Sequence, residues 1–139
     1  MILTAKEIRN RVDADWNGIL DVVKHRIALK AISSQGIAGD HMRRSAEYVA
    51  SLLQEVGVDA RAVQATGADG QPGAWEVIGS LTVDPEAPTV LLYAHHDVQP
   101  VPDAGEWDTA PFTGTQVGDR LYGRGACDDA GGIAIPYGA

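Results

Sequence analysis

The chain has 139 residues, with 11 lysines and arginines against 19 aspartates and glutamates, which gives a formal net charge of −8 at pH 7. Its length suits one domain, and its 45% hydrophobic and 22% charged content is ordinary for a globular protein. The acidic balance argues against nucleic acid as a partner, and without a membrane-length apolar run or a signal-peptide core we expect a cytoplasmic protein that does not engage a membrane.

Two amphipathic helices are predicted at the start of the chain. Thr4 and Glu7 form a capping-box pattern, and apolar residues then recur at helical spacing, which predicts a helix over 5–32. A second helix is predicted to follow Asp40 as its N-cap, and Gly57 stands where a left-handed C-terminal cap is expected. We interpret both apolar stripes as faces that pack into a core.

Short strands are predicted after the two helices. Residues 58–64 and 75–83 are interpreted as strands, and the Gly- and Pro-containing stretch 66–73 as the loop between them. Residues 89–94 form an apolar run whose length and β-branched start predict a buried strand. Residues 113–122 have the pattern of a hairpin. Two helices followed by short strands indicate an α/β or α+β fold.

Polar residues follow the predicted buried strand directly, as His95, His96 and Asp97. In extended backbone His95 and Asp97 point to the same face, and a metal-bound imidazole normally donates its other N–H to a carboxylate or carbonyl. The pattern therefore fits His95 as a metal ligand that Asp97 orients. His96 points the other way and is interpreted as a packing or supporting residue. Taken alone, the triplet is explained more simply as a polar surface turn.

A second candidate is the pair of carboxylates Asp128 and Asp129, in a glycine-rich turn that could lead into a helix. Capping of the helix explains them without any ligand. The functional alternative is that Asp128 supplies a hard oxygen ligand, which would complete a mixed nitrogen and oxygen shell with His95.

These motifs together carry a family resemblance. The segments are YAHHDVQP at 93–100, Trp107 with Pro111-Phe112, LYGRGACDD at 121–129, and the helix RRSAEYVA at 43–50. They resemble the co-catalytic zinc aminoacylase, carboxypeptidase and dipeptidase family, and most of all its carnosinase-like dipeptidase arm. The resemblance runs from about residue 5 to residue 132.

The resemblance implies an α/β fold with a mixed sheet flanked by helices. Residues 1–139 would be the N-terminal part of a metallopeptidase catalytic domain, incomplete at its C-terminal end and without the family's lid domain. His95 would bind one of two zinc ions, Asp97 would be the catalytic-site carboxylate behind it, and Asp128 would bridge both ions. The implied reaction is hydrolysis of the amide bond of a dipeptide or an N-acyl amino acid, with a glutamate as general base.

The sequence departs from the family pattern in three ways. Ala130 follows the paired aspartates where relatives carry lysine, and Pro136 obstructs the helix expected next. The general base and the other ligands lie beyond this point in relatives, and no glutamate follows Glu106. We therefore expect a fragment of a longer enzyme, with weak or absent zinc binding and no peptidase activity by itself, because catalytic zinc normally takes three protein ligands.

Other functions fit the residues less well. A non-catalytic fragment, or a binding or assembly domain that keeps the fold, is the main alternative, and its open strand edges would favour a homo-oligomer. A cysteine hydrolase would use Cys127 with His95 or His96, but the two aspartates after Cys127 disfavour a thiolate. A nucleotide site at Gly123-x-Gly125 fails because Asp128 stands at the third glycine position.

Overall fold

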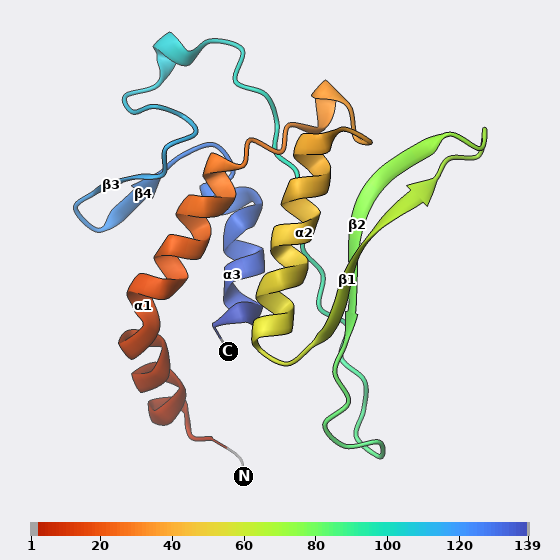
Figure 1. The fold of residues 1–139 in the computed structure, drawn as a ribbon. Coiled ribbons are helices and arrows are strands. Elements are labelled where there is room, and N and C mark those ends of the chain that lie inside the picture. The colour runs from red at the N-terminus through yellow and green to blue at the C-terminus, as the bar shows by residue number, and fades with distance from the viewer. Residues whose placement is uncertain (1–2, 139) are drawn as a thin grey trace.

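Two long helices, a long β-hairpin and a small C-terminal subregion make up the computed structural model, which describes residues 3–138 (Figure 1). Helices α1 (Ala5–Ala28) and α2 (Asp40–Glu55) are joined by a short helical turn, η1 (Ser33–Gln35). The short helix α3 (Gly132–Tyr137) lies between them in Figure 1, and buried apolar side chains from all three helices form one core. The resulting core supports the segments that carry the candidate ligands.

Helix α1 begins as the sequence predicts, with the Thr4 hydroxyl accepting from the Glu7 amide and the Glu7 carboxylate accepting from the Thr4 amide. It ends at Ala28 rather than at 32, because Lys30 adopts a left-handed conformation with φ 51° and Ile32 forms a parallel bridge with Val98. This bridge ties the end of α1 to the segment that carries His95.

Helix α2 confirms the second helix prediction, with a correction at its start. Gly39 is the N-cap, and Asp40 is the first helical residue, where its carboxylate pairs with Arg43 2.5 Å away. The left-handed cap expected at Gly57 is present, with φ 88°.

The two predicted strands of the central region form an antiparallel hairpin, β1 (Asp59–Thr66) and β2 (Pro72–Ser80), in which Asp59 is opposite Ser80. The hairpin contacts α2 along one side (Figure 1). Strands β3 (Thr115–Val117) and β4 (Arg120–Tyr122) form the hairpin expected within 113–122. The prediction of short strands after two helices is thus confirmed.

The buried strand predicted over 89–94 is wrong. The segment belongs to neither sheet, and its side chains are exposed, with Leu91 at 89% and Tyr93 at 86%. The apolar side chains of the run would be stabilised by burial, but within residues 3–138 no strand pairs with the segment. The mixed sheet that the resemblance implied is also not found within residues 3–138. The two sheets there are each antiparallel, and the parallel pairing is a single bridge between Ile32 and Val98.

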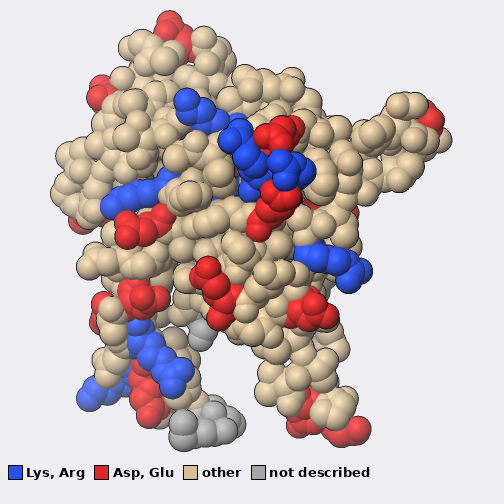
Figure 2. Space-filling model, viewed as in Figure 1, with Lys and Arg blue, Asp and Glu red and all other residues tan. Residues whose placement is uncertain are grey.

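Charges on the face shown in Figure 2 are interspersed, with lysines and arginines beside aspartates and glutamates. Arg43, for example, pairs with both Asp40 and Glu47 on α2. On this face, therefore, positive charge is not clustered in the way that nucleic-acid binding needs. As for the membrane, none of the helices within residues 3–138 combines the length and the apolar character that a crossing requires.

Candidate metal centre

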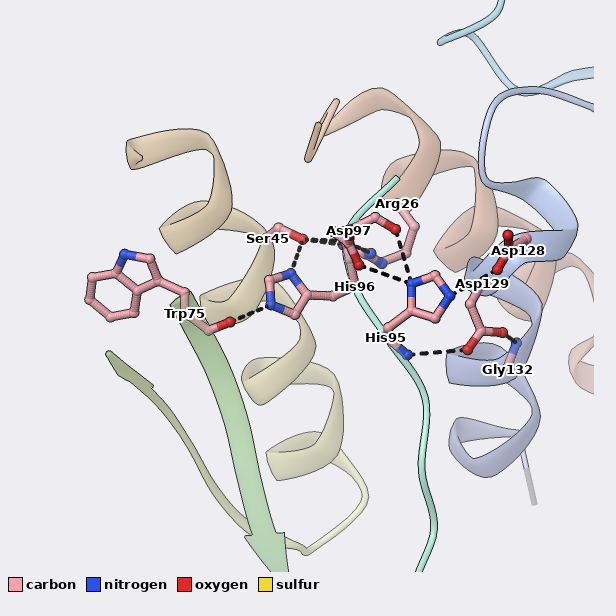
Figure 3. A network of polar contacts seen from close by, with 9 residues as sticks. All are labelled: Arg26, Ser45, Trp75, His95, His96, Asp97, Asp128, Asp129 and Gly132. Carbon is pink, nitrogen blue, oxygen red and sulfur yellow. Dashed lines mark hydrogen bonds and ion pairs between the residues drawn. The ribbon is translucent and has the colours of Figure 1, made fainter. Parts of the chain in front are cut away.

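The side chains of His95, Asp97 and Asp128 lie next to one another (Figure 3). His95 Nε2 lies 2.8 Å from Asp128 Oδ1, and His95 Nδ1 lies 3.0 Å from Asp97 Oδ1. The two chain segments are 33 residues apart in sequence. The structure therefore brings together the three residues selected from the sequence, in the order carboxylate, imidazole, carboxylate.

Hydrogen bonding fixes the orientation of the His95 ring. Nδ1 contacts both the carboxylate and the backbone carbonyl of Asp97, and because a carbonyl accepts, Nδ1 carries the proton. When the ring is protonated, Nε2 donates to Asp128 Oδ1, and loss of that proton leaves the Nε2 lone pair directed toward Asp128. Burial lowers the pKa of His95, but the hydrogen bonds with Asp128 and Asp97 outweigh burial and raise it above its ordinary value.

Asp97 is held as a carboxylate. Its partial burial favours the neutral acid, but hydrogen bonds from Ser33 and His95 outweigh burial and keep the pKa of Asp97 below its ordinary value. An ionised Asp97 attracts the Nδ1 proton of His95 and makes Nε2 a stronger donor of its lone pair, which is the effect of a carboxylate behind a metal-bound histidine.

Asp129 connects the two halves of the site. One of its oxygens accepts from the backbone amide of His95 at 3.2 Å, and the other accepts from the amide of Gly132 at 3.0 Å, at the start of α3. The peptide bond between Asp128 and Asp129 is cis. The sequence analysis grouped Asp129 with Asp128 as a carboxylate pair, whereas the structure assigns it the task of clamping the His95 backbone to the turn.

That turn, η3 (Ala126–Gly131), begins after Gly125, which adopts φ 85°. A Cβ atom at Gly125 would lie 2.5 Å from Val98 Cγ1, so only glycine allows this close approach. The amide of Ala130 donates to the Gly125 carbonyl at 3.0 Å. The contact with Val98 therefore sets how closely the turn that carries Asp128 approaches the segment that carries His95.

His96 points away from the candidate ligands, as expected, and enters a buried network on the other side (Figure 3). Its Nε2 donates to the carbonyl of Trp75 on β2 at 2.8 Å, and its Nδ1 lies 2.9 Å from Ser45 Oγ. Burial and the nearby charge of Arg26 lower the pKa of His96, so the ring is neutral. Sequence reasoning missed Arg26 and Ser45, although a charged residue inside the apolar stripe of α1 was a signal.

The donor set fits two ligands of a divalent zinc ion. An imidazole nitrogen and a carboxylate oxygen are both ordinary zinc ligands, and the Asp128 side chain is 83% exposed, which leaves that side of the pair open. Within residues 3–138 no group of three or more His, Cys, Asp or Glu side chains is arranged to hold a metal ion. The described residues thus offer part of a metal shell rather than a closed one.

The exposed thiol of Cys127 would need His95 or His96 as its base. Both ring nitrogens of His95 are engaged by aspartates, and both ring nitrogens of His96 are engaged by Ser45 and the Trp75 carbonyl. Neither histidine therefore activates Cys127 in this arrangement, which weighs against a cysteine hydrolase.

Comparison with known proteins places the chain beside metallopeptidases. Residues 91–137 match the model of peptidase family M20/M25/M40. The mouse Beta-Ala-His dipeptidase is 34% identical over 108 residues, covering 78% of this chain and 21% of that protein. The Cysteinylglycine-S-conjugate dipeptidase of Corynebacterium striatum is 35% identical over 97 residues, covering 69% of this chain and 20% of that protein.

A solved structure agrees with these matches. The crystal structure of human carnosine dipeptidase 1 superposes with a TM-score of 0.82 at 28% identity, over 95% of this chain and 29% of that one. The resemblance to the carnosinase-like dipeptidases is therefore confirmed. The chain spans about a fifth to three tenths of the length of these relatives.

Proposed function

This chain is related to the M20 peptidase family, and on that premise we propose that it forms part of the catalytic domain of a zinc-dependent dipeptidase. The observation that carries the proposal is the alignment of Asp97, His95 and Asp128, with His95 Nε2 2.8 Å from Asp128 Oδ1 and Nδ1 3.0 Å from Asp97 Oδ1. A polar surface turn does not require a half-buried carboxylate behind a histidine that faces a second, exposed carboxylate.

In this proposal His95 and Asp128 are two of the zinc ligands, and Asp97 is the carboxylate that orients His95. When bound, zinc acidifies a water molecule and polarises the substrate carbonyl. Asp97 holds the proton on Nδ1, so that the lone pair for a metal is the one on Nε2, on the side of Asp128, and Asp129 holds the His95 backbone against the turn. The exposed carboxylate of Asp128 is accessible to a second ion, as a bridging ligand must be.

A groove beside the site has room for a small substrate, which favours the proposal. Its volume is about 760 Å³, within the range of ligand pockets. Trp75 and Ile78 on β2, Leu91 and Ile133 line it, together with His95. The relatives are named for Beta-Ala-His and for a Cysteinylglycine conjugate, and we propose dipeptides or N-acyl amino acids as the substrates of the whole enzyme.

These residues alone are expected to bind zinc weakly and to leave dipeptides intact. Two protein ligands fall short of the three that a catalytic zinc normally takes. The proposal therefore assigns the remaining ligands and the general base to residues outside those described, in the same polypeptide or in a partner.

The test is a zinc titration of the ¹⁵N-labelled chain, followed by NMR of the histidine rings. We expect the Nε2 resonance of His95 to shift with added zinc, and His95→Gln to abolish saturable binding. His25→Gln is the matched control, because His25 stacks on Tyr48 on the surface of α1 and α2, with ring centroids 4.2 Å apart, and should leave the affinity unchanged. If zinc shifts no resonance of His95, or if both variants bind zinc equally, the proposed metal site is wrong.

One observation favours the alternative of an assembly function. Val90, Leu91, Leu92 and Tyr93 form a continuous exposed apolar run, and Leu92, the least exposed of them, is still 69% exposed. Such a run in an unpaired segment favours association with a second copy, and this activity is compatible with the metal site rather than exclusive of it.

A further inference from the structure

Arg26 is a buried charge without a carboxylate partner. Its side chain is only 3% exposed, and among residues 3–138 its hydrogen-bond partners are a hydroxyl and a backbone carbonyl, with Nε left unpaired. Burial lowers the pKa of Arg26 to about 10, although the charges of Tyr48, Asp97 and Asp129 act in the opposite direction. Burying a guanidinium in this way costs free energy. The partners of its two hydrogen bonds therefore indicate the role of Arg26.

Both hydrogen bonds lead to residue 96. Nη2 of Arg26 donates to the His96 carbonyl at 2.5 Å, and Nη1 donates to Ser45 Oγ at 2.5 Å (Figure 3). Ser45 Oγ in turn lies 3.1 Å from the same carbonyl and 2.9 Å from the His96 ring. Side chains from α1 and α2 therefore converge on the one residue between His95 and Asp97.

This convergence matters because the segment has no strand neighbours. Residues 89–97 belong to neither sheet, and backbone pairing begins only at Val98, whose amide donates to the Ala31 carbonyl at 2.8 Å. In a regular sheet, ladder hydrogen bonds on both sides would fix the peptide of His96. Here the contacts of Arg26 and Ser45, with the bond from His96 Nε2 to the Trp75 carbonyl, take that place.

We propose that Arg26 is a positioning residue that fixes the peptide of His96 from α1, so that His95 faces Asp128 and Asp97 stays behind His95. The inference rests on the proposed function. A guanidinium is suited to the task because its planar fork reaches two acceptors at once, here on two different elements. A lysine ammonium at the same position is a point charge on a flexible stem and does not reproduce the fork.

The decisive variant is Arg26→Lys, which keeps the charge and removes the fork. Ser45→Ala is the second variant, because it removes the hydroxyl that contacts His96 and accepts from Arg26 Nη1, while the direct bond from Arg26 Nη2 to the His96 carbonyl stays in place. Leu52→Ala is the matched control, since Leu52 is a buried core residue of α2, at 4% exposure, whose loss destabilises the fold without touching residue 96. All three are compared in the full chain, with and without zinc.

Two measurements separate positioning from general stability. In the metal-free protein, amide hydrogen exchange is followed at His95, whose amide donates to Asp129, and at the core amides of α2. We expect Arg26→Lys and Ser45→Ala to speed exchange at His95 by about tenfold more than at the core amides. With zinc, we expect both to weaken binding about 10–100-fold, as changes behind metal ligands do. Leu52→Ala should speed exchange everywhere alike and leave the zinc affinity of the folded chain unchanged.

The outcomes are distinguishable from those of the proposed function. If the unmodified chain binds no zinc through His95, the metal site fails, while the exchange data still decide whether Arg26 positions the segment. If both Arg26→Lys and Ser45→Ala behave like Leu52→Ala in exchange, Arg26 is an ordinary structural residue and the inference is overturned. Should Arg26→Lys fail to fold, Ser45→Ala alone makes the same comparison.

Discussion

Replacing Gly125 with alanine should strongly destabilise the chain, through two separate costs. The first is conformational: φ is 85° at this position, and holding alanine in the left-handed region costs roughly 1–2 kcal/mol. The second is steric, because the new Cβ would lie 2.5 Å from Val98 Cγ1, whereas carbon atoms pack best at about 3.5–4.0 Å. Overpacking of this kind typically costs about 1–3 kcal/mol.

The two costs together come to about 2–5 kcal/mol, a large part of the roughly 5–15 kcal/mol by which domains are usually stable. The assay is urea unfolding followed by circular dichroism, with Gly118→Ala as the matched control. Gly118 has a similar φ, 62°, but a Cβ there meets nothing within 4 Å, so it carries only the conformational cost. The free energy of unfolding should therefore fall by about 1–3 kcal/mol more in Gly125→Ala than in Gly118→Ala.

Adding Val98→Ala to Gly125→Ala separates the terms further. Removing the Val98 methyl groups relieves the clash, so the double variant should be less destabilised than the sum of the two single variants, by about 1–3 kcal/mol. If Gly125→Ala is no more destabilised than Gly118→Ala, or if the double variant is simply additive, the close contact between the turn and Val98 does not exist in solution and the reasoning is refuted.

Three further predictions concern the site, the exposed run and the start of the fold. Asp97→Asn should weaken zinc binding about 10–100-fold in a calorimetric titration, while Asp103→Asn, in a loop away from the site, should not; equal affinities would remove Asp97 from its orienting role. Leu91→Lys should reduce self-association in sedimentation velocity relative to the unmodified chain, and a chain that is already monomeric would contradict the assembly alternative. Thr4→Ala should fray the first turn of α1 at a cost of about 1 kcal/mol, measured as a local rise in hydrogen exchange, and protection that is unchanged at Ile8 would show that the capping box is not formed.

The parts of the structure that the sequence predicts correctly are those with local signals. The capping box of Thr4 and Glu7 locates the start of α1, and Gly57 locates the end of α2. Likewise, the spacing of His95 and Asp97 predicts that the two side chains meet, because residues two apart in extended backbone point to the same face whatever the rest of the fold. The approach of Asp128 depends on tertiary folding, and here the family resemblance supplied what local pattern could not.

Arg26 and Ser45 illustrate the opposite case. Arg26 follows Val22 and Val23 at steps of four and three, so it occupies the buried face of α1, where a charge is out of place. The pattern could therefore have identified it as anomalous. It could not have identified the partner, because the acceptor is a backbone carbonyl 70 residues away, and every residue has a carbonyl.

The run at 89–94 shows why burial is harder to predict than conformation. The length of this mainly apolar run and its β-branched start are typical of a buried strand, and they led to the prediction of one. Covering both faces requires other elements, and β2 and α2 supply only the groove on one side, while Leu91 and Tyr93 remain exposed. The composition of the run thus favours burial, but neighbouring helices and strands decide whether the run is buried. By the same argument, an element that pairs with 89–94 would add ladder hydrogen bonds to the segment of His95, and the hold of Arg26 on His96 would then matter less.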